Sequence, residues 1–278
     1  MLAVLSRLPL SVLHRLGALV GWLVYGLSPT YRRHLRENLA LAFPANPRLR
    51  RAAIAQAGMA LMELPKLWLR PPEEVCALIR EVRGWEIAQR AHDEGRGIVF
   101  LTPHLGCFEI SAMYIGGSIP MTVLYRPPKQ RWLEPYMQRG RGARMKLAPA
   151  NLSGVRELLR ALRKHGAVGL LPDQVPGNGE GVWAPFFGRP AYTMTLAARL
   201  LESGAALISV SAERLPQGAG YRLSFYAPEL PPQADAAARA AAINAEIERL
   251  IRLCPQQYLW GYNRYKGPGN AEAPAQPQ

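Results

Sequence analysis

The chain has 278 residues, 49% of them hydrophobic, which is enough to bury the core of one large α/β domain or of two small ones. Its 34 basic and 20 acidic residues give a formal net charge of +14, which favours an anionic partner: nucleic acid, an acidic protein, a phosphorylated substrate or an anionic membrane surface. The three cysteines form no paired framework and lack metal-ligand spacing, so the sequence argues against a disulfide scaffold and a metal site, and suggests a reducing compartment.

The N-terminal segment is almost wholly apolar from Leu2 to Leu27. Its charge-free run, which begins at Leu16, is shorter than the roughly 20 residues that cross a bilayer. No small-residue cleavage signature follows, which argues against a secretory signal peptide. We therefore predict a membrane anchor over residues 1–28, tilted or lying in the interface, with Trp22 near the headgroups. A buried core helix is the alternative.

A basic cluster, Tyr31-Arg32-Arg33-His34-Leu35-Arg36, follows directly. Basic residues just after an apolar helix favour the cytoplasmic side and contact with anionic lipid, worth about 1 kcal/mol per charge near the surface. The pattern over residues 31–80 predicts helices. Within it, Arg48–Leu69 carries apolar residues at three-to-four spacing and then stops at Pro71-Pro72.

From about residue 82, short apolar runs alternate with helical patterns. The predicted strands are Gly97–Thr102, Met121–Tyr125, Ala167–Pro172, Leu207–Arg214 and Tyr221–Tyr226. The predicted helices are Trp85–Glu94, Gly106–Gly116, Gln130–Gly142, Ser153–His165, Thr193–Ser203 and Ala234–Leu253. This alternation predicts an α/β fold, with a mostly parallel central sheet flanked by helices. The tail, residues 267–278, is rich in Pro, Ala and Gln and is predicted to be disordered.

Polar motifs follow three of the predicted strands: His104–Glu109, Tyr125-Arg126-Pro127 and Pro172-Asp173-Gln174. In parallel sheets, binding sites gather at the carboxyl ends of the strands. The coincidence of three such motifs therefore predicts one shared pocket.

The first of these motifs places a histidine and a carboxylate five positions apart. Residues with this spacing point about 140° apart on a helix and to opposite faces of a strand, so the two side chains meet only across a turn. Pro103 and Gly106 allow that turn. We expect His104 at a strand exit and Glu109 in the first turn of the next helix, orienting a neutral imidazole that acts as a general base. A satisfied histidine beside a surface glutamate is the alternative.

No serine follows that would complete a hydrolase triad, so a substrate hydroxyl is the expected nucleophile. Arg126 could bind a phosphate or carboxylate, or stabilise a developing oxyanion. Asp173 could orient Arg126 or the substrate hydroxyl. A solvated loop arginine and a turn or cap aspartate are the alternatives.

The glycine-rich segment Gly177–Trp183 does not open a helix as a dinucleotide fingerprint does, so a mobile lid is the better interpretation. Phe186 and Phe187 could line an acyl-chain channel, with Arg189 offered to an anionic group. Two core phenylalanines and a surface arginine are the alternative. Cys107 could be a nucleophile paired with a histidine, although a small half-buried cysteine is the commoner case.

Together these segments resemble the late acyltransferases of lipid A biosynthesis, the lauroyl/myristoyl transferases of Gram-negative bacteria, within the wider lysophospholipid acyltransferase-like superfamily. The resemblance covers nearly the whole chain, and the set of motifs is highly specific. The motifs are Asn38–Pro44, HLGCFE at 104–109, LYRPPK at 124–129, LLPDQVPGNGEGVWAPFFGRPAYT at 170–193 and Trp260–Lys266.

The resemblance implies that His104 and Glu109 are the catalytic pair. It matches Arg126 and Asp173 to the arginine and the aspartate of the family's Tyr-Arg-Pro and Pro-Asp-Gln motifs. Many relatives read Asn-Trp where this chain has Cys107-Phe108. Both positions lie between the catalytic residues, so the change bears on chain-length or acceptor preference more than on the reaction.

For the oxyanion of the tetrahedral intermediate, the expected donors are Arg126 and the backbone N–H groups at the start of the predicted 106–116 helix, Gly106 included.

The resemblance further implies that residues 29–266 form an acyltransferase domain at the cytoplasmic face of the inner membrane, working without a cofactor. The donor would be an acyl thioester on acyl carrier protein. The acceptor would be the Kdo-bearing, tetra-acylated lipid A precursor, lipid IVA, attacking through a free 3-hydroxyacyl group. The positive charge would serve the carrier protein, the acceptor's phosphates and carboxylates, and anionic inner-membrane lipid; nucleic acid is not an expected partner.

Three alternatives remain open. One is acylation of another lipid, such as a glycerophosphate, an ornithine lipid or a mannoside glycolipid. Another is a thioesterase using Cys107 or activated water. The last is a non-enzymatic basic protein that binds membranes or nucleic acid, which fits the charge but not the three polar motifs at strand exits.

Overall fold

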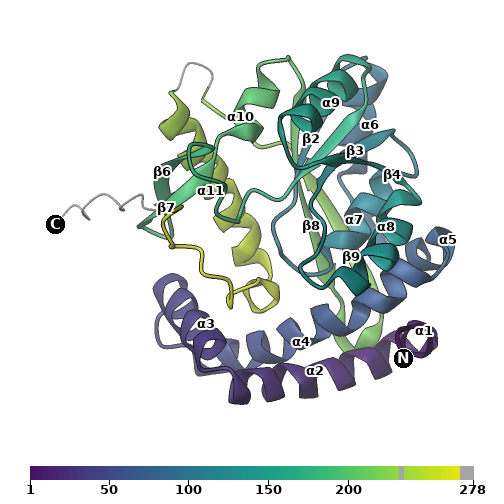
Figure 1. Cartoon of the computed structure of the whole chain (residues 1–278), viewed down its shortest axis with the longest axis vertical. Helices are drawn as coiled ribbons and strands as arrows, with labels where there is room; N and C mark the ends of the chain where they lie inside the picture. The colour runs from purple at the N-terminus through teal and green to yellow at the C-terminus, as the bar shows by residue number, and fades with distance from the viewer. Residues whose placement is uncertain (232–234, 270–278) are drawn as a thin grey trace.

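The computed structural model describes residues 1–231 and 235–269, and at its centre lies a seven-stranded sheet (Figure 1). The strand order is β1-β9-β8-β2-β5-β3-β4, and the five strands from β8 to β4 run parallel to one another. Strand β9 pairs antiparallel with β8, and β1 pairs parallel with β9. The predicted α/β fold with a mostly parallel sheet flanked by helices is confirmed. The strands are β1 Ile79–Arg83, β2 Ile98–Leu101, β3 Met121–Tyr125, β4 Met145–Pro149, β5 Ala167–Leu170, β8 Ala206–Arg214 and β9 Tyr221–Tyr226.

The central strands are buried on both faces, because helices cover the sheet from each side. Val99 and Leu101 of β2 pack into one hydrophobic core with residues of α9, α10 and α11. Ile98 and Phe100 point the other way, into a second core that includes residues of α6 and α7. The continuous apolar run of β2 therefore serves two cores at once.

The α-helices are α1 Leu2–Arg7, α2 Leu10–Leu27, α3 Pro29–Ala42, α4 Pro47–Leu69, α5 Pro72–Cys76, α6 Trp85–Asp93, α7 Phe108–Ile115, α8 Glu134–Gly142, α9 Leu152–Arg163, α10 Leu196–Leu201 and α11 Ala236–Leu253. Short 3-10 turns are η1 Arg131–Leu133, η2 Pro216–Gly218 and η3 Pro255–Gln257. An antiparallel hairpin, β6 Gly181–Phe186 and β7 Arg189–Met194, forms a separate two-stranded sheet.

Several element boundaries correct the sequence prediction. The stretch predicted as helical to residue 80 ends in strand β1, and the sheet's edge strand β4 lies in a segment with no predicted strand. The segment interpreted as a lid runs into the hairpin strand β6. The predicted start of the last helix, Ala234, and most of the predicted disordered tail lie outside the described residues.

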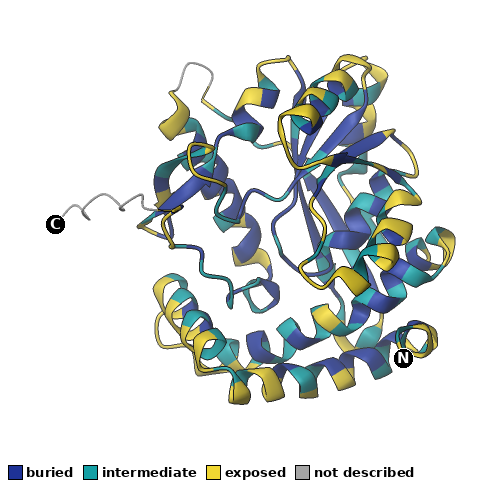
Figure 2. Ribbon diagram, viewed as in Figure 1, coloured by how far each residue is buried: buried dark blue, intermediate teal, exposed yellow. Residues whose placement is uncertain are grey.

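Helix α2 lies along α4 at the base of the molecule (Figure 1). Three glycines allow backbone contact: a Cβ on Gly58 would lie 1.9 Å from the carbonyl oxygen of Gly17 and 2.4 Å from the nitrogen of Gly21. The opposite side of α2 is exposed, as Figure 2 shows, with Leu19 at 68% and Leu23 at 59% relative exposure. Helix α2 is thus neither a buried core helix nor free of the domain.

Among the described residues, α2 is the one helix whose length and composition would suit a membrane crossing, with a mean hydropathy of 1.4 over 18 residues.

Candidate active site

His104 lies in the turn that follows β2, and several backbone hydrogen bonds hold this turn. The N–H of Leu259 donates to the carbonyl oxygen of His104 at 3.1 Å, and the N–H of Gly106 donates to the carbonyl oxygen of Gln257 at 3.0 Å. The segment after α11 therefore fixes the histidine loop from the side.

Asp173 reaches His104 from the neighbouring strand. Strands β2 and β5 are parallel neighbours, so the residues that follow them meet at one edge of the sheet. Oδ1 of Asp173 lies 2.9 Å from the ring Nδ1 of His104, and Oδ2 accepts the backbone N–H of the same residue at 2.9 Å. The Asp173 side chain is 2% exposed and that of His104 is 16% exposed, so the pair is shielded while the imidazole keeps an open side.

The partners of the ring identify its tautomer. An ionised carboxylate only accepts hydrogen bonds, so Nδ1 of His104 carries the proton that Asp173 binds. The other nitrogen, Nε2, then has a free lone pair and accepts from the side-chain amide of Gln174 at 3.1 Å. Nε2 is therefore the nitrogen that can take a proton from an incoming hydroxyl.

The carboxyl of Asp173 stays ionised in this setting. Burial by itself would raise its pKa, but the electrostatic interaction with the His104 side chain and the hydrogen bonds from that residue outweigh burial, and the pKa is lowered. A fixed negative charge next to Nδ1 stabilises the imidazolium that forms when Nε2 is protonated.

The structure corrects the predicted partner of the histidine. Glu109 lies in the first turn of α7, as predicted, but both of its carboxylate oxygens accept from Arg141 of α8. The Arg141 Nε–Oε2 distance is 3.0 Å, and the second contact is made by Nη2. The ring of His104 instead contacts Phe108, with 4.8 Å between ring centroids.

The ion pair is mostly shielded from water, because Glu109 is 6% and Arg141 22% exposed at the side chain. Burial would lower the pKa of the Arg141 guanidinium, but the charge and hydrogen bonds of Glu109 raise it overall. The pair joins the first turn of α7 to α8 and so supports the wall of the site next to His104.

Arg126 and Gly106 occupy different environments. Arg126 follows β3, which pairs with β5, so it lies at the predicted edge of the sheet; its side chain is exposed and, in the described part of the chain, makes no hydrogen bond or ion pair. The predicted orientation of Arg126 by Asp173 is not found, since Asp173 binds His104.

Gly106 allows close packing: its φ is +59°, and a Cβ there would lie 1.9 Å from the carbonyl oxygen of Ala212. Its N–H is engaged by Gln257, which corrects its prediction as an oxyanion donor.

The aromatic pair of the hairpin belongs to the core. Phe186 and Phe187 are 2% and 8% exposed and pack against Tyr258 and Trp260, so they do not line an open channel. Arg189 is exposed, and its guanidinium lies 4.8 Å above the ring of Tyr265.

Sequence reasoning missed two residues of the site, Gln174 and Arg141. Gln174 belongs to the Pro172-Asp173-Gln174 motif, so its position gave a signal. Arg141 is one of several arginines in a basic stretch with no distinguishing pattern. The C-terminal segment also takes part, because the hydroxyl of Tyr262 accepts the backbone N–H of Val175 at 3.0 Å, two residues after Asp173.

Cys107 is buried in this loop, and burial raises the pKa of its thiol well above the usual value. A thiol in this state is a poor nucleophile at neutral pH.

A family model described as "Bacterial lipid A biosynthesis acyltransferase" matches residues 1–267. The chain is similar to the lipid A biosynthesis lauroyltransferase of Escherichia coli (strain K12), with 31% identity over 94% of this chain and 87% of that protein. It is also similar to the lipid A biosynthesis palmitoleoyltransferase of the same strain, with 32% identity over 94% and 87%. The lipid A biosynthesis myristoyltransferase of that strain is 26% identical over 90% of this chain and 78% of its own length.

Proposed function

The chain belongs to the bacterial lipid A biosynthesis acyltransferase family, and we propose that it transfers a fatty acyl chain from acyl carrier protein to a hydroxyacyl group of the lipid A precursor. The acyltransferase role in lipid A biosynthesis follows from the family. The finer proposal names the Kdo-bearing, tetra-acylated precursor lipid IVA as the acceptor. The observation that carries the proposal of acyl transfer to a hydroxyl is the His104–Asp173 pair, in which Nε2 of His104 can accept a proton from an alcohol.

The reaction begins when the 3-hydroxyl of the acceptor takes the place of Gln174 as hydrogen-bond donor to Nε2 of His104. Nε2 removes the hydroxyl proton as the oxygen attacks the thioester carbonyl carbon, and Asp173 stabilises the resulting imidazolium. The tetrahedral intermediate then collapses. The carbon–sulfur bond breaks, the carrier's thiolate takes the proton from Nε2, and an ester remains on the acceptor.

The oxyanion of the intermediate needs donors from this edge of the sheet. Arg126 is suited to the role, since its guanidinium is exposed at the exit of β3 and is not engaged by a carboxylate of the described residues. The N–H groups of the first turn of α7 are further candidates, beginning after Cys107, whose own N–H donates to Ala212 at 2.8 Å. In this scheme the Glu109–Arg141 pair positions α7 rather than touching the substrate.

The exposed face of α2 supports association with the cytoplasmic face of the inner membrane. Leu19, Leu23 and Leu27 follow one another at helical spacing on the side away from α4, each at least 59% exposed. Such a stripe would bury its leucines at the interface while its other side stays packed on the domain. Helix α3 follows at once, so its first turn would lie close to the interface.

The direct test uses the purified protein with acyl thioesters of acyl carrier protein and of coenzyme A, and with lipid IVA and a glycerophosphate as acceptors. The proposal expects transfer from the carrier protein to lipid IVA, giving a product one acyl chain heavier. In a strain lacking the gene, mass spectrometry of lipid A should show the loss of one secondary acyl chain. Unchanged lipid A in that strain would reject the proposal.

Membrane association is tested without removing α2, because deletion would uncover α4. A Leu19→Gln/Leu23→Gln variant should bind phospholipid vesicles at least about 10-fold more weakly, since each leucine loses its apolar burial. A matched control is Leu152→Gln/Leu253→Gln, two leucines that are 78% and 53% exposed on other helices. Equal binding by both variants would place the membrane contact elsewhere.

A further inference from the structure

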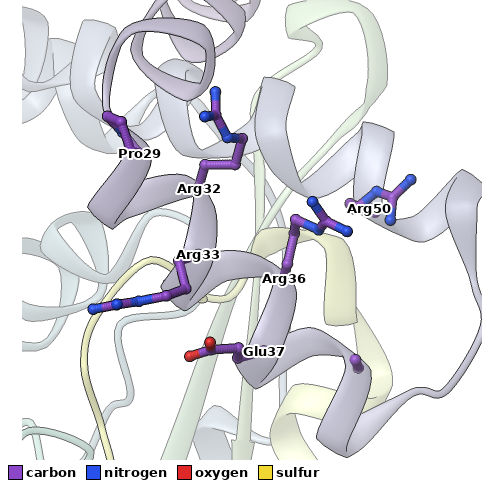
Figure 3. Close-up of a pocket in the computed structure, with 7 residues that line it drawn as sticks. Pro29, Arg32, Arg33, Arg36, Glu37 and Arg50 are labelled. Carbon is purple, nitrogen blue, oxygen red and sulfur yellow. The ribbon is translucent and has the colours of Figure 1, made fainter.

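Arginine side chains of α3 and α4 line a concave surface pocket of about 430 Å³ (Figure 3). The charged residues around it are Arg32, Arg33, Arg36, Glu37 and Arg50. Figure 3 shows Arg36 and Arg50, which reach this pocket from α3 and α4 respectively. The lining of this pocket therefore holds four arginines and a single carboxylate.

Only one of these arginines has a structural partner. Arg32 donates to the carbonyl oxygens of Tyr25 and Gly26 at 3.3 and 3.1 Å, where it caps the end of α2. Within the described residues, the side chains of Arg33, Arg36 and Arg50 make no hydrogen bond or ion pair. Gathering like charges around a hollow is unfavourable unless an anion fills it, and the planar guanidinium suits phosphate oxygens.

A second pocket of about 310 Å³ adjoins the first, because Arg33 and Glu37 line both. It adds Arg189 and Lys266. Both cations are held over aromatic rings: Arg189 lies 4.8 Å from the ring centre of Tyr265, and Lys266 lies 5.4 Å from that of Tyr262.

A short chain of contacts links the second pocket to the candidate active site. The same Tyr262 that contacts Lys266 accepts the N–H of Val175, just after Asp173 and Gln174. On its other side, the first pocket begins at the end of α2, whose exposed leucines form the apolar stripe. The two pockets therefore span from an apolar surface to the segment that supports the reacting histidine.

We propose that these joined pockets bind phosphate groups on the saccharide headgroup of the acceptor. This inference rests on the proposed function, since it assigns the headgroup end of the same substrate. Two pockets that share Arg33 suit a headgroup carrying two anionic groups, while its acyl chains continue along the apolar face of α2. Concave walls from α3, α4, β7 and the C-terminal segment favour a defined ligand over the diffuse charge of a bilayer.

The experiment compares two acceptors in neutral detergent micelles: lipid IVA, and the same lipid lacking one phosphate. The variant is Arg36→Gln/Arg50→Gln, which removes two charges from the first pocket. Its matched control is Arg90→Gln/Arg96→Gln, two exposed arginines that precede β2 and so lie at the opposite edge of the sheet. For lipid IVA, we expect KM to rise about 10- to 100-fold in the pocket variant, with kcat within about threefold.

With the lipid that lacks the phosphate bound by Arg36 and Arg50, wild type and variant should have nearly equal KM values. Neither protein can make the contact between those arginines and that phosphate. If the missing phosphate is the one in the second pocket, Arg189→Gln/Lys266→Gln should give this result instead. An unchanged KM for lipid IVA in both pocket variants would overturn the proposal. It would also be overturned if, in each pocket variant, KM rose equally for lipid IVA and for the lipid lacking one phosphate.

A vesicle assay separates the bilayer as an alternative source of phosphate. Wild type and pocket variant should bind phosphatidylglycerol vesicles alike. If the pocket variant binds these vesicles more weakly than the wild type while its KM for lipid IVA in micelles is unchanged, the pockets bind bilayer lipid and the proposal is wrong.

Failure of the proposed function would look different: the wild type itself would transfer no acyl chain. Equilibrium binding of the two lipids without donor still tests the pockets in that case. Weaker binding of lipid IVA by the pocket variants supports the assignment, and unchanged binding contradicts it.

Discussion

Asp173 binds His104 through both of its carboxylate oxygens, one on the ring nitrogen Nδ1 and one on the backbone N–H, each at 2.9 Å. The double contact fixes the ring relative to the main chain as well as its tautomer. Because the two residues follow neighbouring parallel strands, the sheet itself sets their separation.

An Asp173→Asn variant should lower kcat by about 100- to 10,000-fold while the protein remains folded. The asparagine amide would face Nδ1 and favour the tautomer with the proton on Nε2, where the base must be free. The measurement is acyl transfer with saturating substrates, alongside circular dichroism. Asp93→Asn, an exposed aspartate at the end of α6, serves as the control and should keep full activity. Wild-type kcat in Asp173→Asn would show that the carboxylate does not orient the base.

Glu109 and Arg141 should act as one unit. Removing either partner leaves a mostly buried charge unpaired, so Glu109→Gln and Arg141→Gln should each lower the free energy of unfolding by about 3 kcal/mol. Both single variants should lose kcat to a similar extent, and the double variant should lose no more than either one. Chemical denaturation and acyl transfer are measured on all three. If only Glu109→Gln lost activity while Arg141→Gln kept it, the glutamate would act directly on the reaction.

A buried carboxylate between α2, α4 and the sheet should dominate the acid stability. Glu63 accepts from Arg214 at 2.6 and 2.9 Å, from the hydroxyl of Tyr221 at 2.9 Å, and lies 3.3 Å from Nε2 of His14. Burial would raise its pKa, but the charge and hydrogen bonds of Arg214, aided by those of His14, lower it. A carboxyl whose pKa is lowered by folding contributes stability above its unfolded pKa, and this contribution is lost as the pH falls through the folded value.

The wild-type free energy of unfolding should therefore fall as the pH drops below the ordinary carboxyl range, and Glu63→Gln should show a flatter dependence. Urea unfolding at a series of pH values measures both slopes. Glu86→Gln, an exposed carboxylate of α6, should leave the wild-type slope unchanged. A Glu63→Gln variant with the full wild-type slope would assign the acid sensitivity to other groups.

Cys107→Ala should keep kcat within about threefold, because the buried thiol, with its raised pKa, is not a thiolate at neutral pH. Iodoacetamide should accordingly label Cys107 of the native protein much more slowly than that of the unfolded protein, as followed by mass spectrometry. Loss of activity in a folded Cys107→Ala variant would favour the thioesterase mechanism.

The sequence predicted the architecture well where a pattern repeats over many residues. The alternating elements after residue 82 gave the parallel sheet, and Arg48–Leu69 matches α4, Pro47–Leu69, to within one residue. Strand β4 was not predicted, because its five residues, Met145–Pro149, include lysine and proline at exposed edge positions. The convergence of the three polar motifs on one edge was also predictable, since it follows from the order of parallel strands.

The pairing inside the site was not predictable. The five-residue spacing drew attention to Glu109, but its carboxylate binds Arg141, 32 positions away, and the partner of His104 comes from 69 positions away. Local spacing does not determine such contacts, because strand order decides which loops become neighbours. The basic composition likewise predicted an anionic partner but did not indicate where the pockets of α3 would lie.

The central claim is that Nε2 of His104 removes the proton of the attacking hydroxyl. The kcat of a variant that lacks this imidazole tests the claim most directly. The measurement is acyl transfer by His104→Ala, using acyl carrier protein thioester and purified lipid IVA, with vesicle binding as evidence of a native fold. The account predicts at least a 100-fold loss of kcat, about the lower limit for removing a general base, with unchanged vesicle binding. Near wild-type turnover by this variant would contradict the account.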